Sequence, residues 1–269
     1  MKAGDYVWFV LLAFYALLIW FRDISWMSTA EDTLPILVAL PLFVMLLWPW
    51  EFAKEKTPLS TVQLACALLL FPLGIVTNLT ILLAISWTWL LWLWLNSRIA
   101  APSKDQIAKL LILPFMAFPW ITLDAAPIGW WFRLSGAWAT AHVFSFLGAN
   151  VYQDGTQLLI NMQPIDVEVA CSGLNTLQSM IIAGSVAAFV TLGEYKRYWF
   201  SLPFLVLMAW VANTIRIIIL VLAALLVSPA FALGTFHTFG GWLVLMLMFI
   251  LSWAVFVAMA PKEEHQEKS

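Results

Sequence analysis

The chain has 269 residues, of which 63% are hydrophobic and only 10% are charged. This composition excludes a soluble globular domain and indicates an all-α polytopic membrane protein. The formal net charge of −2 comes without a block of basic residues, so no nucleic-acid partner is expected.

Several apolar segments each have close to the roughly 20 residues that a helix needs to cross a hydrocarbon core of about 30 Å. We expect about eight transmembrane helices from them. Asn78 alone separates the third segment from the fourth, which predicts a tight helical hairpin there. In chain order the segments are Tyr6–Phe21, Leu34–Trp50, Ser60–Thr77, Leu79–Leu95, Ile107–Leu123, Asn175–Leu192, Trp199–Val227 and Gly241–Met259.

The basic residues indicate how these helices are oriented, because cytoplasmic loops carry an excess of Lys and Arg. If the N-terminus is cytoplasmic, only Arg22, Arg133 and Arg216 of the 13 basic residues lie on the outer side. The others then lie inside: Lys2, Lys54, Lys56, Arg98, Lys104, Lys109, Lys196, Arg197, Lys262 and Lys268. This asymmetry predicts that both termini are cytoplasmic and that the chain around residue 171 faces outward.

The stretch Trp130–Leu147 is amphipathic and more polar than the spans. We interpret it as a helix that lies in the outer interface. A full crossing is the alternative, but it would place Lys196 and Arg197 outside. His142 fits an interfacial polar residue better than a catalyst. The apolar residues that recur at helical spacing, with Arg133, Thr140 and His142 off their stripe, are Trp131, Leu134, Trp138, Ala141 and Phe144.

Three short segments before residue 171 have the features of β-strands. They are Val151–Thr156, Leu158–Met162 and Ile165–Val169, with an Asp-Gly turn signal in the first and apolar–polar alternation in the third. We expect a small extracytoplasmic β-hairpin or three-stranded flap, since strand structure cannot face lipid. Such a flap could hold an extended peptide, and an ordinary external loop is the equal alternative.

Cys171 is predicted to lie in the first turn of a membrane helix, at the water boundary. The unpaired N–H groups and the positive dipole end of a helix N-terminus favour a thiolate over a thiol. Gly173 lets another backbone approach closely. A purely structural cysteine is the alternative of about equal weight, and we assign Cys66, in the middle of an apolar segment, to that class.

Arg216 is the second candidate. The segment Trp199–Val227 has 29 residues (227 − 199 + 1), or about 43 Å of helix. Arg216 lies 17 residues (216 − 199) from its start, about 26 Å along the helix and level with Cys171. Asn213 shares its face. An intramembrane arginine normally faces a polar cavity or a partner, although snorkelling to the interface is the alternative.

His237 is the third candidate, because it precedes the last span on the same outer side. A lone interfacial histidine is usually a solvated loop residue. Three groups at one depth, from three separate helix ends, instead favour a common site. A cysteine, a histidine and an arginine are the parts of a thiol acyl-transfer site.

In such a site His237 takes the proton of Cys171 and later protonates the leaving amine. Arg216 stabilises the thiolate or the oxyanion of the tetrahedral intermediate. Asn213, Ser172 and Gly173 are the candidates for substrate or oxyanion support. One His and one Cys without spaced partners fall short of a zinc site, so we expect no metal and no cofactor.

Three motifs resemble those of the exosortase/archaeosortase family: Ala170-Cys171-Ser172-Gly173-Leu174, Asn213-Thr214-Ile215-Arg216, and His237 followed by Gly240-Gly241-Trp242. The resemblance covers roughly Ile121 to Met259. It divides the chain into N-terminal transmembrane helices (1–120), an exosortase-like catalytic core (121–260) and a cytoplasmic tail (261–269). Asn175 stands where many bacterial members have an arginine.

The resemblance implies a multi-pass cysteine protease or transpeptidase of the plasma (inner) membrane, with its active site at the extracytoplasmic face. Cys171 would be the nucleophile, with Arg216 and His237 as the other catalytic residues. The implied substrate is a membrane-anchored protein with a C-terminal sorting signal that consists of a short motif, a helix and a basic cluster. The implied acceptor of the new C-terminus is an envelope component such as a lipid or glycan.

Two other classes of protein compete with this interpretation. A transporter or channel component would explain the many spans and Arg216, but not the position of Cys171, and the sequence has no inverted internal repeat. A non-catalytic assembly protein is the second rival. A protein of either class should tolerate Cys171→Ala.

Overall fold

The computed structural model describes residues 3–53, 55, 57–167 and 171–261. It is mostly helical and contains a small antiparallel sheet. The helices are α1 (Ala3–Arg22), the 3-10 helix η1 (Ser25–Met27), α2 (Ala30–Leu46), α3 (Thr61–Thr77), α4 (Thr80–Asn96), α5 (Ala101–Leu110), α6 (Ile112–Met116), α7 (Trp120–Asp124), α8 (Ala126–Phe146), α9 (Leu174–Leu192), α10 (Tyr198–Leu226), α11 (Pro229–Leu233) and α12 (Thr235–Met259). The strands are β1 (Val151–Asp154), β2 (Gln157–Ile160) and β3 (Gln163–Asp166).

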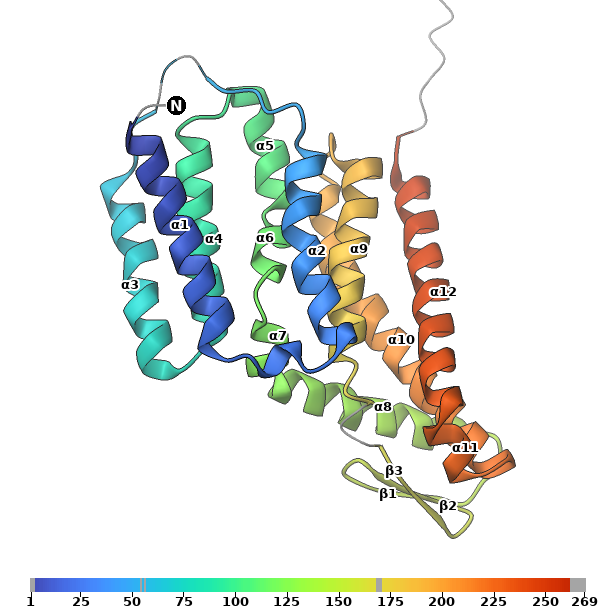
Figure 1. Cartoon of the computed structure of the whole chain (residues 1–269). Helices are drawn as coiled ribbons and strands as arrows, with labels where there is room; N and C mark the ends of the chain where they lie inside the picture. Colours follow the sequence, from blue (N-terminus) through green and yellow to red (C-terminus); the bar gives the residue numbers. More distant parts are fainter. Residues whose placement is uncertain (1–2, 54, 56, 168–170, 262–269) are drawn as a thin grey trace, which may run out of the picture.

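Most of the long helices lie side by side, and α8 lies crosswise at one end of the bundle with the sheet beyond it (Figure 1). On one side of the molecule α1 and α3 pack on α4, and on the other side α2, α10 and α12 each pack on α9. The start of α1 and the end of α12 lie at the end of the bundle opposite the sheet (Figure 1). The start of α9, which follows Cys171 in the chain, and the start of α12, which carries His237, lie at the sheet end.

Three helices in the described part of the chain are long and apolar enough to cross a membrane: Leu174–Leu192, Tyr198–Leu226 and Phe239–Met259. Four shorter apolar helices, in α1 to α4, match the first four predicted spans. The Asn78 hairpin is confirmed, because Asn78 caps α3 in the left-handed conformation with a φ of 60°. A total of eight spans stays a prediction.

The fifth predicted span, Ile107–Leu123, is not one helix, and the prediction is wrong there. The segment is divided among α5, α6 and α7. Pro114 and Pro119 explain both breaks, since a proline ring clashes with the carbonyl group four residues earlier. Accordingly, α5 ends at Leu110, four residues before Pro114, and α6 ends at Met116, near the corresponding position for Pro119.

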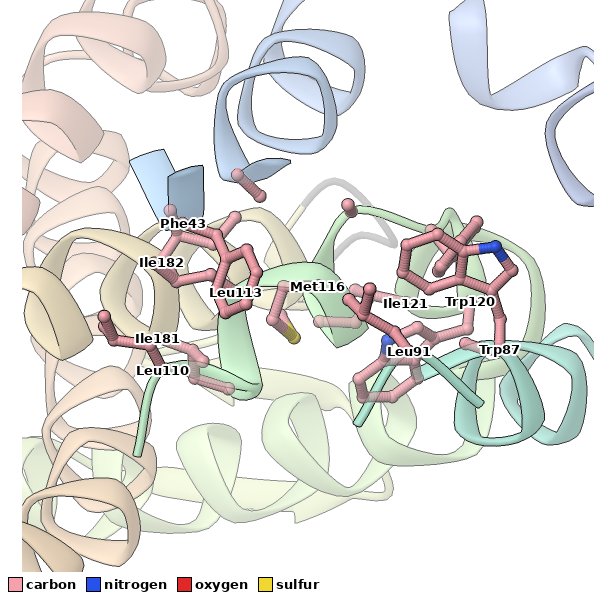
Figure 2. Packing of buried hydrophobic residues seen from close by; sticks show 14 of the residues in the cluster. Phe43, Trp87, Leu91, Leu110, Leu113, Met116, Trp120, Ile121, Ile181 and Ile182 are labelled. Atoms are coloured by element: carbon pink, nitrogen blue, oxygen red, sulfur yellow. The ribbon is translucent and has the colours of Figure 1, made fainter. Parts of the chain in front are cut away.

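This broken segment forms the centre of the hydrophobic core. Figure 2 shows Leu113 and Met116 between Phe43 and Ile182 on one side and the α4 helix with Leu91 on the other. All of these side chains are buried. Non-helical backbone is tolerated at membrane depth where protein surrounds it, and the packing here meets that condition.

Helix α8 confirms the helix predicted over Trp130–Leu147, whose position in the outer interface stays a prediction. The predicted apolar stripe includes both buried residues, Ala141 and Phe144, and exposed ones. Thr140 is buried, whereas Trp131 and Trp138 are exposed. The reason is the close approach of α10: a Cβ atom at Gly136 would lie only 2.5 Å from Cδ1 of Ile217. Small residues therefore face α10, and the bulky indoles point away from it.

The predicted flap is a three-stranded antiparallel sheet in the order β1-β2-β3. Val151 pairs with Ile160 in the first hairpin, and Gln157 pairs with Asp166 in the second. Leu158 and Ile160 are buried in a cluster with residues of α8 and α10 and with Cys171. The sheet and the cysteine therefore belong to one hydrophobic cluster. The end of the predicted strand Ile165–Val169 lies outside the described residues.

The division of the chain at residue 120 stays a prediction. Residues 262–269 of the predicted tail lie outside the described residues. So do five of the basic residues used for orientation: Lys2, Lys54, Lys56, Lys262 and Lys268.

Asp124 connects the core to the start of α4. The N-cap position of α4 is occupied by Leu79, which has no side-chain acceptor, and Oδ2 of Asp124 accepts a hydrogen bond from the Ile81 amide at 2.6 Å. Burial raises the pKa of the Asp124 carboxyl group, and donation from the Ile81 and Thr80 amides opposes that rise. A residue 43 positions away thus supplies the cap that the local sequence lacks.

We expect Asp124→Ala to destabilise the protein by about 1 kcal/mol, the usual cost of losing an N-cap acceptor. Asp124→Asn retains an acceptor oxygen and should recover part of that loss. Thermal unfolding of the purified protein in detergent measures both effects. Identical midpoints for wild type and Asp124→Ala would contradict the capping role.

Candidate active site

Cys171 lies directly before α9 rather than in its first turn, so the predicted helical position is wrong. Helix α9 begins at Leu174, and Gly173 is its N-cap residue with a left-handed φ of 72°. This glycine conformation separates the cysteine from the regular helix. The Cys171 side chain is buried, with 5% of its surface exposed.

Asn213 of α10 holds the cysteine in place. Its Nδ2 donates a hydrogen bond to the carbonyl oxygen of Cys171 at 3.0 Å, and its side chain is buried. Gly173 permits this approach, because a Cβ atom at that position would lie 2.6 Å from Cγ of Asn213. Positive φ also favours glycine there. Asn213 is therefore a positioning residue that ties the cysteine backbone to α10.

His237 lies in the first turn of α12, because α12 begins at Thr235 and not at the predicted Gly241. The distance from Sγ of Cys171 to Nε2 of His237 is 3.7 Å, within the range of a sulfur hydrogen bond. This separation suits direct proton transfer between the thiol and the imidazole.

Arg216 lies against the same imidazole. Its Nη2 is 3.1 Å from Nε2 and 3.3 Å from Nδ1 of His237, and it also donates to the His237 carbonyl oxygen at 3.4 Å. A guanidinium group here favours negative charge that develops beside it. The structure thus brings the three predicted groups, Cys171, Arg216 and His237, into one cluster.

Gly241 belongs to the third motif, but sequence reasoning assigned it no role in the site. A Cβ atom at position 241 would lie 2.9 Å from both Cζ and Nε of Arg216. The absence of a side chain therefore lets the guanidinium lie against α12, one turn after His237. The signal in the sequence is the spacing: positions 237 and 241 share a helix face.

Two other candidates lie apart from this cluster. Ser172 packs on α8, since a Cβ atom at Gly129 would lie 3.0 Å from Cβ of Ser172. His142 is exposed, and its Nδ1 lies 2.8 Å from the carbonyl oxygen of Trp138 in its own helix. The prediction of an oxyanion role for Ser172 therefore has no supporting contact among the described residues.

The cluster opens into two separate cavities. A groove of about 400 Å³ lies among α2, α9 and α12, and Arg216 and His237 belong to its lining. A slot of about 180 Å³ lies between β3, α10 and α11, and Cys171 belongs to its lining. Cys171 thus lines one cavity, and its two partners, Arg216 and His237, line the other.

The described residues include no group of three or more His, Cys, Asp or Glu side chains that could hold a metal ion. The site is therefore described by its thiol, imidazole and guanidinium alone.

The likeness to a known family extends over most of the chain. The family model for the transmembrane exosortase matches residues 4–254. The chain belongs to the transmembrane exosortase family. No curated protein and no solved structure matches it. The match begins within α1, so the exosortase homology includes the N-terminal helices and not only the segment from Ile121 that carries the motifs.

We expect Gly241→Ala to lower exosortase activity by about tenfold or more, because the new methyl group displaces Arg216 from His237. Gly240→Ala is the matched control: a Cβ atom there meets nothing closer than 3.9 Å. Both changes raise helix propensity equally, so helix stability cannot explain a difference. The measurement is the rate of processing of a co-expressed substrate. Equal rates in the two variants would contradict the role of this contact.

Proposed function

We propose that this protein is a membrane-embedded cysteine transpeptidase that cleaves the C-terminal sorting signal of exported proteins and transfers the new C-terminus to an envelope acceptor. The observation that carries the proposal is the 3.7 Å distance between Sγ of Cys171 and Nε2 of His237, with Arg216 against the same ring. Membership of the transmembrane exosortase family supports the same class of reaction.

In the first half of the reaction His237 accepts the thiol proton, and the sulfur attacks the carbonyl carbon of the scissile peptide bond. The carbonyl oxygen becomes an oxyanion, whose charge the Arg216 guanidinium stabilises. His237 then returns the proton to the peptide nitrogen. The C–N bond breaks, the C-terminal segment leaves with a new amino group, and the exported part remains as a thioester on Cys171.

In the second half an amine or hydroxyl group of a lipid or glycan attacks the thioester carbon. His237 takes the proton of the acceptor, the C–S bond breaks, and the thiolate is regenerated. Water in the acceptor's place gives simple hydrolysis, which would make the enzyme a protease. Burial of Cys171 supports transfer, because a site that excludes water protects a thioester from hydrolysis.

We further propose a multi-pass protein of the plasma membrane with both termini cytoplasmic and the active site at the extracytoplasmic face. The distribution of basic residues supports this orientation. In agreement with it, the site and the sheet lie at one end of the bundle, while the start of α1 and the end of α12 lie at the other (Figure 1).

We expect Cys171→Ala and Cys171→Ser to abolish processing, because a serine hydroxyl is poorly activated in a site built for a thiolate. The assay follows a co-expressed protein of the same organism whose chain ends in a motif, an apolar helix of about 20 residues and a basic cluster. Cleavage and any added mass are read by gel shift and mass spectrometry.

Cys66→Ala is the matched control, since Cys66 is exposed on α3 and away from the site, and it should retain full activity. Normal cleavage by Cys171→Ala would refute the nucleophile and favour a transporter or assembly protein. Cleavage without added mass on the product would retain the nucleophile and remove the transferase half of the proposal.

The orientation predicts which loops a membrane-impermeant thiol reagent reaches. In a chain without native cysteines, Asp154→Cys in the exposed β1–β2 turn should be labelled in intact spheroplasts. Glu55→Cys, in the exposed loop between α2 and α3, should be labelled only after permeabilisation. The opposite pattern would invert the topology and place the site in the cytoplasm.

A further inference from the structure

The two cavities beside the cluster are lined by different groups of the candidate site. The slot is lined by Cys171, and the groove is lined by Arg216 and His237. The acyl part of a substrate becomes bonded to the sulfur. The leaving nitrogen must reach the imidazole that protonates it. The two products of cleavage therefore depart from different sides of the cluster.

The groove has the position and length for the first two to three turns of a membrane helix. Its walls are α2 and α12, and α9 forms its floor. The lining residues extend from Ala30 to Leu42 on α2, about 18 Å of helix, and from Asn175 to Ala183 on α9, about 12 Å. It therefore runs along the bundle away from His237.

The floor of the groove favours a helix over a lipid tail. The lining residues Asn175, Ser179 and Ala183 recur every four positions on α9, so they form one stripe of small or polar side chains. Small residues let two helix backbones approach closely in a membrane, and hydroxyl and amide groups can hydrogen-bond across that contact. An acyl chain would leave those groups without partners.

The slot is suited to a side chain of an extended segment. Its lining is apolar apart from Asp166 and Cys171, and includes Ile165 on β3 and Ala224 on α10. Engineered apolar cavities of about 150 Å³ hold a benzene ring, so about 180 Å³ leaves room for one branched or aromatic side chain. The sheet that covers the slot lies beyond the end of the helix bundle (Figure 1).

Building on the proposed function, we propose that the substrate is divided at Cys171 between these cavities. Its membrane helix docks laterally in the α2–α9–α12 groove, with its first residues at His237. The residues just upstream of the scissile bond lie in the slot under β3 and present an apolar side chain to it. The slot therefore selects the residue next to the cleavage point, and the groove selects a helix.

Substitutions that fill each cavity test the two halves separately. Ala183→Phe on the groove floor and Ala224→Phe in the slot should each reduce cleavage about tenfold or more. The controls are Val190→Phe and Leu222→Phe, on the same two helices at exposed positions outside both linings, and these should cleave at the wild-type rate. Equal cleavage by all four variants would overturn the division.

Photo-crosslinking identifies the occupants and remains informative if a filled variant misfolds. A benzoylphenylalanine at position 38, in the groove, or at 165, in the slot, is placed in the uncleaving Cys171→Ala chain. The probe is the tagged substrate described above, with a protease site between its exported domain and its helix. Positions 37 and 152, which are exposed outside both linings, serve as the controls.

We expect position 38 to label the helix fragment, position 165 to label the exported fragment, and the controls to label neither. Reversed labelling, or adducts with lipid alone at position 38, would overturn the proposal. Wild-type cleavage of the same probe is scored in parallel. Cleavage without the expected adducts refutes the division but retains the proposed function, whereas no cleavage by the wild type refutes the proposed function itself.

Discussion

The hydrogen bond from Asn213 to the carbonyl oxygen of Cys171 is the interaction on which the site depends. It fixes the backbone of the cysteine to α10 at 3.0 Å. Arg216 follows one turn later on the same helix, so a single rigid element sets the positions of both the sulfur and the guanidinium. Gly173 and Gly241 then allow Asn213 and Arg216 to reach their partners.

The lipid environment explains why the site lies where it does. Polar and irregular backbone is costly in hydrocarbon, so strands and loops collect at the end of the bundle or inside the protein. The sheet lies at the end of the bundle, next to the loop that carries Cys171 (Figure 1). The broken segment α5–α7 lies inside the protein, with its apolar side chains buried among α2, α4 and α9 (Figure 2).

Much of this architecture could be predicted from residue patterns. The length of the apolar segments predicted the long helices. The Asp-Gly turn signal and the alternation of apolar and polar residues predicted the sheet. Cys171, Arg216 and His237 could be assigned to one site because the length of helix before a residue fixes its depth in the membrane. The prediction of a continuous fifth helix was wrong because hydropathy does not take into account that Pro114 and Pro119 break a helix. Which residues of α8 contact α10 could not be predicted, because the stripe of apolar residues includes Trp131 and Trp138, which face outward. The role of Gly241 was not predicted, because the need for a residue without a side chain becomes visible only once the position of Arg216 is known.

Helix α12 performs two tasks that cannot be separated mechanically. It carries His237 to the sulfur, and it also forms one wall of the groove. Any movement that widens the groove by drawing this end of α12 away from α9 lengthens the Cys171–His237 distance at the same time. The width of the groove and the distance between the thiol and the imidazole therefore depend on the same helix.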